Sequence, residues 1–121
     1  MTKVLAVDDS ASMRQMLEFA LKRAGYEVDT ASEPNSALSL IDKNNYALII
    51  SDVNMPGMDG YAFVEAARKK AHCRFTPILM LTTESSAEQK ARGKQAGATG
   101  WLVKPFNPEQ LVATIQKVVN R

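Results

Sequence analysis

A short apolar run that leads into a single carboxylate constrains this chain most. Residues 47–50 are apolar, Asp52 follows after one serine, and a Pro-Gly pair at 56–57 ends the run. Its length and composition are typical of a buried strand, so we predict a strand over 47–52. Open α/β sheets carry their functional groups at the carboxyl ends of the strands, where Asp52 would lie. A carboxylate buried there is costly in free energy unless other groups pair with it.

The remainder of the chain alternates between strand-like and helix-like patterns. Strands are predicted over 3–7, 26–31, 47–52, 78–82 and 101–103. Helices are predicted over 13–24, 34–42, from 61 into the polar run 68–74, over 86–96, and from 107 to the last residue given. Gly25 is placed to cap the end of the first helix, and Asn107 to cap the start of the last. The fourth helix has the weakest apolar face of the five.

This alternation predicts an α/β fold, in which a doubly wound parallel sheet of five strands has helices on both faces. Right-handed crossovers bring the carboxyl ends of all five strands to one edge. The polar residues at these ends come from four separate segments and are Asp8, Asp9, Asp52, Thr82 and Lys104. We therefore expect these five side chains to converge.

The three carboxylates of this set indicate a magnesium site. Crowded on one edge, they would repel one another, and some would keep their protons unless a cation joined them. Hard oxygen ligands without sulfur or imidazole favour Mg²⁺ over zinc or copper. His72 and Cys73, the only histidine and cysteine, belong to a segment away from this edge. The cofactor that we expect is Mg²⁺.

Lys104 and Thr82 extend this chemistry to phosphoryl groups. The lysine supplies a compact positive charge that suits a carboxylate or a phosphoryl oxygen, and the threonine offers a hydroxyl. Together with a metal and a carboxylate nucleophile, they are typical of a phosphoryl site. A small phosphohydrolase of the haloacid-dehalogenase type would use the same groups. That enzyme would need a second carboxylate at the position where this chain has Asn54.

A flavodoxin-like cofactor binder is an alternative of another class. It would need a phosphate loop rich in glycine or hydroxyl groups after the first strand, where Asp8 and Asp9 would instead repel phosphate. The net charge of +2 is too small to indicate a nucleic-acid or membrane partner. No apolar stretch has the length of a membrane span, and a single cysteine is compatible with a reducing cytosol. We expect a cytoplasmic protein.

Each of these residues also has a simple structural explanation. These explanations are helix capping for Asp8 to Ser10, a turn for Asp52, strand ends for Thr82 and Thr83, a surface position for Lys104 and core packing for Trp101. The basic segment 68–74 is interpreted as a solvated helix end, because cations are favoured at that end of a helix.

Four signatures occur in one order along the chain: the pair Asp8-Asp9, the segment from Asp52 through Val-Asn-Met-Pro-Gly-Met-Asp-Gly, Thr82, and Lys104-Pro105-Phe106. Together they resemble a response-regulator receiver domain over the whole chain, and within that family the single-domain CheY-type chemotaxis regulators. The resemblance implies a flavodoxin-like (βα)5 fold with strand order 2-1-3-4-5. It also implies one receiver domain over 1–121 with no output domain.

The resemblance assigns the acidic residues two roles. Asp52 would be the phosphoacceptor. The Mg²⁺ ligands would be Asp8, Asp9, Asp52 and the backbone carbonyl of Asn54.

The same resemblance assigns the remaining residues to the phosphorylated state. Thr82 and Lys104 would stabilise the phosphoryl group, and a cis peptide bond between Lys104 and Pro105 would aim the lysine inward. Thr82, Thr83 and Trp101 would form the switch. Two of these depart from the family pattern, since Trp101 stands where tyrosine or phenylalanine is usual and Thr83 replaces a small residue.

The function implied is that of a signalling protein rather than an enzyme. Asp52 would receive a phosphoryl group from a CheA-like histidine kinase or a small phosphodonor and later lose it to water. The surface of the fourth helix, fifth strand and fifth helix would then change and bind, as a monomer, an output partner such as the flagellar motor switch. A phosphatase is a further partner.

Other members of the family serve as phosphorelay intermediates or phosphate sinks, and these roles stay open. A degenerate receiver that acts only as a binding module is another alternative. It would have lost one of the acids or the lysine, all of which are present.

Overall fold

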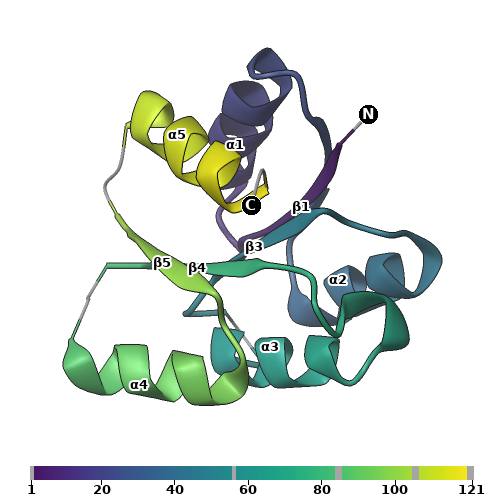
Figure 1. The fold of residues 1–121 in the computed structure, drawn as a ribbon, viewed down its shortest axis with the longest axis vertical. Helices are drawn as coiled ribbons and strands as arrows, with labels where there is room; N and C mark the ends of the chain where they lie inside the picture. The colour runs from purple at the N-terminus through teal and green to yellow at the C-terminus, as the bar shows by residue number, and fades with distance from the viewer. Residues whose placement is uncertain (1, 56, 84–85, 105–106, 120–121) are drawn as a thin grey trace.

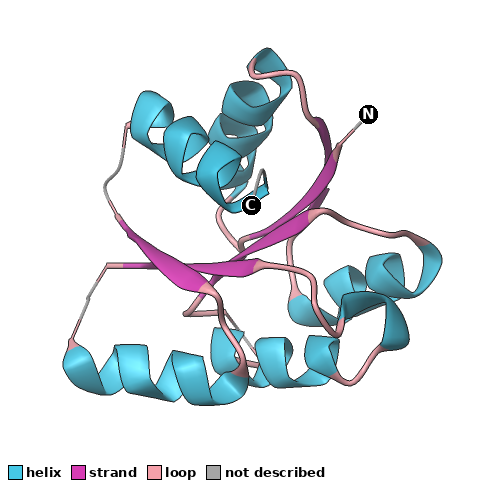
Figure 2. Ribbon diagram, in the orientation of Figure 1, coloured by secondary structure: helices cyan, strands magenta, loops and turns pink. Residues whose placement is uncertain are grey.

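Strands and helices alternate along the chain, as the sequence predicts (Figure 2). The computed structural model describes residues 2–55, 57–83, 86–104 and 107–119. The elements are β1 (Lys3–Val7), α1 (Ala11–Arg23), β2 (Glu27–Ala31), α2 (Pro34–Lys43), β3 (Leu48–Asp52), α3 (Gly60–Arg68), the 3-10 helix η1 (Ala71–Cys73), β4 (Ile78–Thr82), α4 (Ala87–Ala96), β5 (Gly100–Val103) and α5 (Pro108–Val119). Every predicted strand is present, with its ends shifted by at most one residue.

The strands form one parallel sheet in the order β2-β1-β3-β4-β5. This confirms the predicted doubly wound, flavodoxin-like fold. Helices α1 and α5 cover one face of the sheet, and α2, α3 and α4 cover the other (Figure 1). The strand order reverses between β1 and β3. In open α/β sheets, ligands bind beside the carboxyl ends of the strands at such a reversal.

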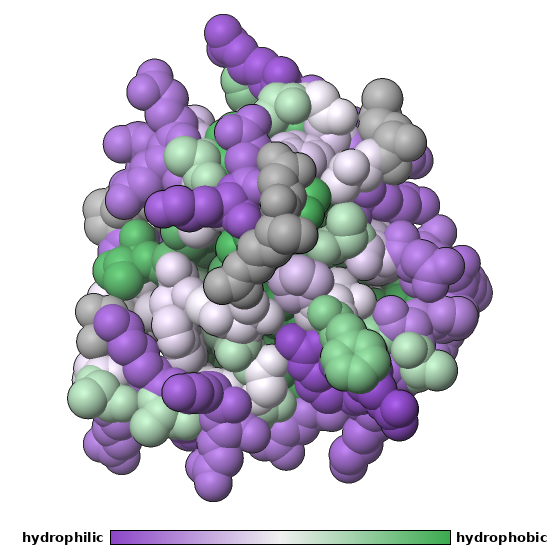
Figure 3. All heavy atoms as spheres, viewed as in Figure 1, coloured by the Kyte–Doolittle hydropathy of each residue, from purple (hydrophilic) through white to green (hydrophobic). Residues whose placement is uncertain are grey.

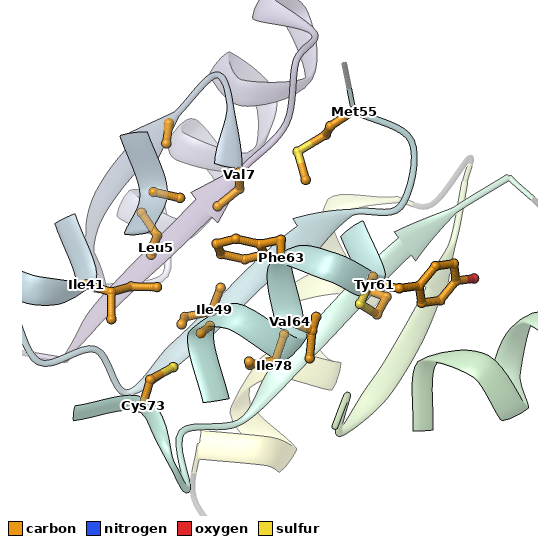
Figure 4. Packing of buried hydrophobic residues seen from close by; sticks show 14 of the residues in the cluster. Leu5, Val7, Ile41, Ile49, Met55, Tyr61, Phe63, Val64, Cys73 and Ile78 are labelled. Carbon is orange, nitrogen blue, oxygen red and sulfur yellow. The ribbon is translucent and has the colours of Figure 1, made fainter. Parts of the chain in front are cut away.

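The central strands are buried on both sides, which explains their continuous apolar runs. Every residue of β3 and β4 is buried. Alternate residues face opposite layers, so that Leu5 and Ile49 belong to the cluster under α2 and α3, whereas Val4 and Ile50 pack under α1 and α5. Figure 4 shows the first of these layers, with Phe63 of α3 at its centre.

Cys73 lies at the end of that layer away from the acidic edge (Figure 4). It is 1% exposed, and burial raises the pKa of its thiol. The only cysteine of the chain is therefore a packing residue in this structure.

Arg68 corrects the interpretation of segment 68–74 as a solvated helix end. Its guanidinium donates hydrogen bonds to the backbone carbonyls of Cys73 (2.8 Å) and Thr76, and to the carbonyl of Gly97 through Nε (3.0 Å) and Nη2 (2.8 Å). One side chain thus joins the end of α3 to the segment before β4 and to the turn between α4 and β5. The prediction was wrong for Arg68 because its partners are backbone carbonyls from distant segments, which leave no pattern in the sequence.

The surface seen in Figure 3 is mostly hydrophilic, with apolar residues in scattered patches. The large apolar side chains most exposed among the described residues are Phe19 (67%) and Phe75 (88%). None of the described helices combines the length and apolar character needed to cross a membrane.

Candidate functional site

The carboxyl ends of the strands bring the predicted side chains to one edge of the sheet. Asp52 is the last residue of β3, which lies between β1 and β4, so it occupies the middle of this edge. Asp8 follows β1 and is fully buried, and its backbone N–H donates to the carbonyl of Ala31 at 3.1 Å. Lys104 follows β5, and its backbone N–H donates to the carbonyl of Thr82 at 2.7 Å.

The ammonium group of Lys104 joins two buried carboxylates. Its Nζ lies 3.2 Å from Asp8 Oδ2 and 3.3 Å from Asp52 Oδ1. The side chains of Lys104, Asp8 and Asp52 are only 16%, 0% and 8% exposed. Charges interact more strongly at such a site than in water, and an unpaired charge there is more costly. Lys104 is therefore part of the site and not a solvated surface lysine.

Asp9 completes a cluster of three acids. One carboxylate oxygen from each of Asp8, Asp9 and Asp52 lies within 4.8 Å of the other two. Asp9 is exposed whereas the other two are buried, so the cluster meets solvent on the side of Asp9. Mg²⁺ binds a few carboxylates and keeps several waters, and it therefore suits this donor set.

The burial of Asp52 and its acidic neighbour change the pKa of its carboxyl. Burial, followed by repulsion from Asp8, raises the pKa of Asp52 above its usual value of 3.8. Lys104 and a hydrogen bond from the backbone of Asn54 oppose this effect without cancelling it. One ammonium group thus leaves part of the negative charge uncompensated, and a divalent cation would offset the remainder.

Neighbouring residues fix the position of Asp8. The backbone N–H of Ser10 donates to Asp8 Oδ1 at 2.9 Å, and Arg14 Nη1 donates to the Asp8 backbone carbonyl at 2.8 Å. The cap of α1 is Ser10, whose hydroxyl accepts from the N–H of Met13 at 3.3 Å. Asp8 therefore keeps its second carboxylate oxygen for Lys104. The role of Arg14 was not predicted, because a contact with a backbone carbonyl has no sequence signature.

The end of β4 is linked to helix α4. Thr82 is 3% exposed, and its hydroxyl lies 3.5 Å from Oε1 of Gln89 on α4. The adjacent Thr83 is exposed. A change in the position of the Thr82 hydroxyl would therefore alter its contact with Gln89 of α4.

Comparison with known families decides which chemistry this edge belongs to. The model of the response regulator receiver domain matches residues 4–116. The chain belongs to the response regulator receiver domain family. The chain is therefore a receiver domain of the two-component signalling class. Membership of this family decides against the phosphohydrolase and the flavodoxin-like cofactor binder.

Curated relatives of the receiver include transcriptional regulators. It is 41% identical over 119 residues to the probable transcriptional regulator ycf27 of Porphyra purpurea, covering 98% of this chain and 48% of the relative. It is 36% identical over 120 residues to the transcriptional regulatory protein ResD of Bacillus subtilis, covering 99% of this chain and 49% of ResD. The receiver therefore spans about half the length of these relatives.

Solved structures similar to the receiver include a chemotaxis regulator. The chemotaxis response regulator CheY4 of Vibrio cholerae is 59% identical, with a TM-score of 0.94 and 98% of both chains covered. The receiver domain of the sensor histidine kinase PA1611 of Pseudomonas aeruginosa, with magnesium in its active-site cleft, is 26% identical. Its TM-score is 0.91, with 99% of this chain and 98% of that chain covered. The resemblance to CheY-type receivers is confirmed.

The remaining residues that the sequence predicts for the site are Asn54, Trp101 and Pro105. Asn54 is exposed two residues after Asp52, and its carbonyl as a metal ligand stays a prediction. Trp101 lies half-buried on β5, beside Tyr61 of α3. The predicted cis peptide bond involves Pro105, which lies outside the described residues.

Proposed function

We propose that this receiver accepts a phosphoryl group on Asp52 in the presence of Mg²⁺. The observation that carries the proposal is the ion pair between Asp52 and Lys104 at 3.3 Å, beside Asp8 and Asp9. Carboxylate nucleophiles form acyl phosphates, and phosphoryl transfer depends chiefly on positioning and on positive charge around the phosphoryl oxygens. Lys104 supplies such a charge where the nucleophile stands.

Transfer would exchange one bond to phosphorus for another. An oxygen of the Asp52 carboxylate forms a bond to phosphorus while the bond between phosphorus and a histidine nitrogen of the kinase breaks. The imidazole leaves with the electron pair. In the later hydrolysis, water attacks phosphorus, the bond to Asp52 breaks, and inorganic phosphate leaves. Lys104 and the Thr82 hydroxyl would stabilise the phosphoryl oxygens between these two steps.

Asp8, Asp9, Asp52 and the backbone carbonyl of Asn54 would hold Mg²⁺. When bound, the ion supplies positive charge against the phosphoryl oxygens. The three carboxylates within 4.8 Å of one another support this assignment, as does the magnesium site of a similar receiver. This chain's own contribution is to keep Asp8 and Asp52 buried and ionisable next to Lys104.

Phosphorylation would change the surface formed by α4, β5 and α5. Moving the Thr82 hydroxyl toward the phosphoryl group would remove its contact with Gln89 of α4 and shift an existing equilibrium of that helix. Thr83 and Trp101 would take part as switch residues.

The partners that we propose are a CheA-like histidine kinase and an output protein such as the flagellar motor switch, with a phosphatase as a further partner. The likeness to CheY4 of Vibrio cholerae supports a role in chemotaxis and a cytoplasmic location. Curated relatives include transcriptional regulators, so the family is not confined to chemotaxis. A phosphorelay intermediate or a phosphate sink is the alternative role.

An intact mass spectrum after incubation with acetyl phosphate tests the chemistry. We expect a gain of one phosphoryl group that requires Mg²⁺ and that is absent in Asp52→Asn. A matched control is Asp42→Asn, which removes a carboxylate that pairs with Lys70 at 2.8 Å and not with Lys104, and should leave the gain unchanged. Full labelling of Asp52→Asn would overturn the acceptor assignment. A wild-type chain that takes no phosphoryl group from acetyl phosphate or from a phosphorylated kinase would overturn the proposal.

A further inference from the structure

Phe75 is the most exposed large apolar side chain among the described residues. Its ring is 88% exposed and is not part of either of the two apolar clusters. Phe19, the next most exposed, differs because it lines a groove between α1 and α5 together with other apolar side chains. Single exposed apolar residues are common on protein surfaces, so the case for Phe75 depends on its surroundings.

The backbone around Phe75 is held in place from inside the protein. The guanidinium of Arg68 donates hydrogen bonds to the carbonyls of Cys73 (2.8 Å) and Thr76, which lie on either side of it in the chain. The Thr76 hydroxyl donates to the carbonyl of His72 at 3.2 Å, and the Cys73 side chain is buried in the apolar layer shown in Figure 4. The ring is therefore displayed from an ordered backbone. A binding surface that is ordered beforehand loses less conformational entropy on association.

The segment that carries this ring is positively charged. No aspartate or glutamate occurs over 66–83. Lys69 and Arg74 are exposed, and within the described ranges neither of them forms an ion pair. Asp42 at the end of α2 is already paired with Lys70 at 2.8 Å, so it does not neutralise them. The exposed ring is thus accompanied by two cations whose charge is available to a partner.

This combination favours a protein as the partner. Aromatic residues and arginine are enriched at protein interfaces and among the residues that contribute most to binding. Nucleic-acid binding commonly neutralises about six to ten phosphates, which is more than two cations provide. Recognition of an anionic membrane commonly uses clusters of about four to eight basic residues. Exposed cations are complementary to carboxylates on a partner protein.

We propose that Phe75, Arg74 and Lys69 form a docking surface for an acidic, partly apolar segment of a partner protein. Apolar side chains of that segment cover the ring, and its carboxylates pair with the two cations. The surface precedes β4, whereas the phosphoryl site follows this strand of five residues, about 15 Å away. A partner bound here leaves the acidic edge open, so the proposal does not depend on phosphorylation of Asp52.

The test begins with a phage-displayed library of random peptides, selected on the wild-type receiver after depletion on Phe75→Ser. We expect the enriched peptides to combine aspartate or glutamate with aromatic or aliphatic residues. Fluorescence anisotropy of the labelled peptides then measures their affinity for the full chain. The affinity should fall at least about ten-fold in Phe75→Ser and in Arg74→Glu, because a few side chains contribute most of the binding free energy. It should also fall as the salt concentration rises.

The matched controls are Phe19→Ser and Arg23→Glu. They remove an exposed ring and reverse an exposed cation on α1, and they should leave the affinity unchanged. Phe75→Ser should keep the urea midpoint of the wild type, because its ring is in solvent. A clearly lower midpoint would show that the ring serves the fold, and would overturn the proposal.

Three further results would also overturn it. One is a selection that enriches no peptide, or only peptides without acidic residues. Another is an affinity that Phe75→Ser and Arg74→Glu leave unchanged. The third is binding to duplex DNA or to phosphatidylserine vesicles that Phe75→Ser abolishes, which would assign the surface to another class of partner. None of these measurements uses a phosphodonor, so they decide the docking surface separately from the phosphoryl chemistry.

Discussion

The carboxylates of Asp52 and Asp8 both pair with the ammonium group of Lys104. Lys104 lies 3.2 Å from one carboxylate and 3.3 Å from the other, and both acids are buried. The arrangement keeps a nucleophile and metal ligands close together at the cost of like-charge repulsion, which is a common feature of functional sites. The stability of the molecule should therefore improve when this repulsion is removed.

The first prediction concerns Asp52→Asn. The change removes a negative charge next to Asp8, leaves Lys104 to pair with Asp8, and should raise the free energy of unfolding at pH 7 by about 1 kcal/mol. Because the pKa of Asp52 is raised in the folded state, the folded protein binds this proton more tightly than the unfolded chain. The contribution of Asp52 to stability is therefore lost as the pH rises from 3.8, the ordinary pKa of this carboxyl, through the raised pKa of the folded protein.

The advantage of Asp52→Asn should accordingly be largest near neutral pH and shrink on acidification toward about pH 4. Urea unfolding of both proteins without Mg²⁺, at several pH values, measures this difference. An advantage that grows as the pH falls would show that the sign assigned to Asp52 is wrong.

Among single residues, topology made Asp8, Asp9, Asp52 and Lys104 predictable. Each follows or ends an apolar strand, and parallel strands end at one edge, so their meeting follows from the pattern alone. Gly93 of α4, by contrast, lies against the ring of Trp101 on β5. A lone glycine in a polar helix carries no sign of that partner.

The elements differ in how strongly the sequence specifies them. Strands β3 and β4 were predictable because a strand buried on both faces must be apolar throughout. Helix α4 was recognised with the weakest apolar face, and only two of its residues are buried. The 3-10 helix η1 was missed, because three residues in a polar segment provide no period to detect.

The second prediction concerns the joint between elements made by Arg68. Replacing it with methionine keeps the length of the side chain but removes the hydrogen bonds to Cys73, Thr76 and Gly97. Carbonyls that are partly buried would lose a charged donor, so we expect a loss of about 2–3 kcal/mol in the free energy of unfolding. Urea unfolding measures it. The control Lys69→Met changes an exposed neighbour and should cost less than about 0.5 kcal/mol, and equal effects would contradict the role of Arg68.

At the scale of the whole molecule, the sheet divides the receiver into a rigid centre and a loosely attached side. The two apolar clusters lie on opposite faces of β1, β3 and β4, whose residues are nearly all buried. Helix α4 lies over one side of the sheet with few buried residues (Figure 1). Regions that open at low free energy cost are those with few buried apolar contacts.

The third prediction is a corresponding gradient in amide hydrogen exchange. Amides of β3 and β4 should exchange most slowly, close to the limit set by global unfolding, and amides in the middle of α4 should exchange at least about ten-fold faster than those of α3. Hydrogen exchange followed by mass spectrometry resolves these segments. Equal protection of α3 and α4 would show that α4 does not open separately from the core.

The burial of Cys73 has a practical consequence for following these motions. The thiolate is the species that reacts with labelling reagents, and burial both hides this sulfur and raises the pKa of its thiol. A second cysteine placed at an exposed position, such as Val103→Cys beside Lys104, would therefore be modified alone while the native sequence is otherwise kept. A single dye attached there would sit next to the acidic edge and report changes at β5 as they happen.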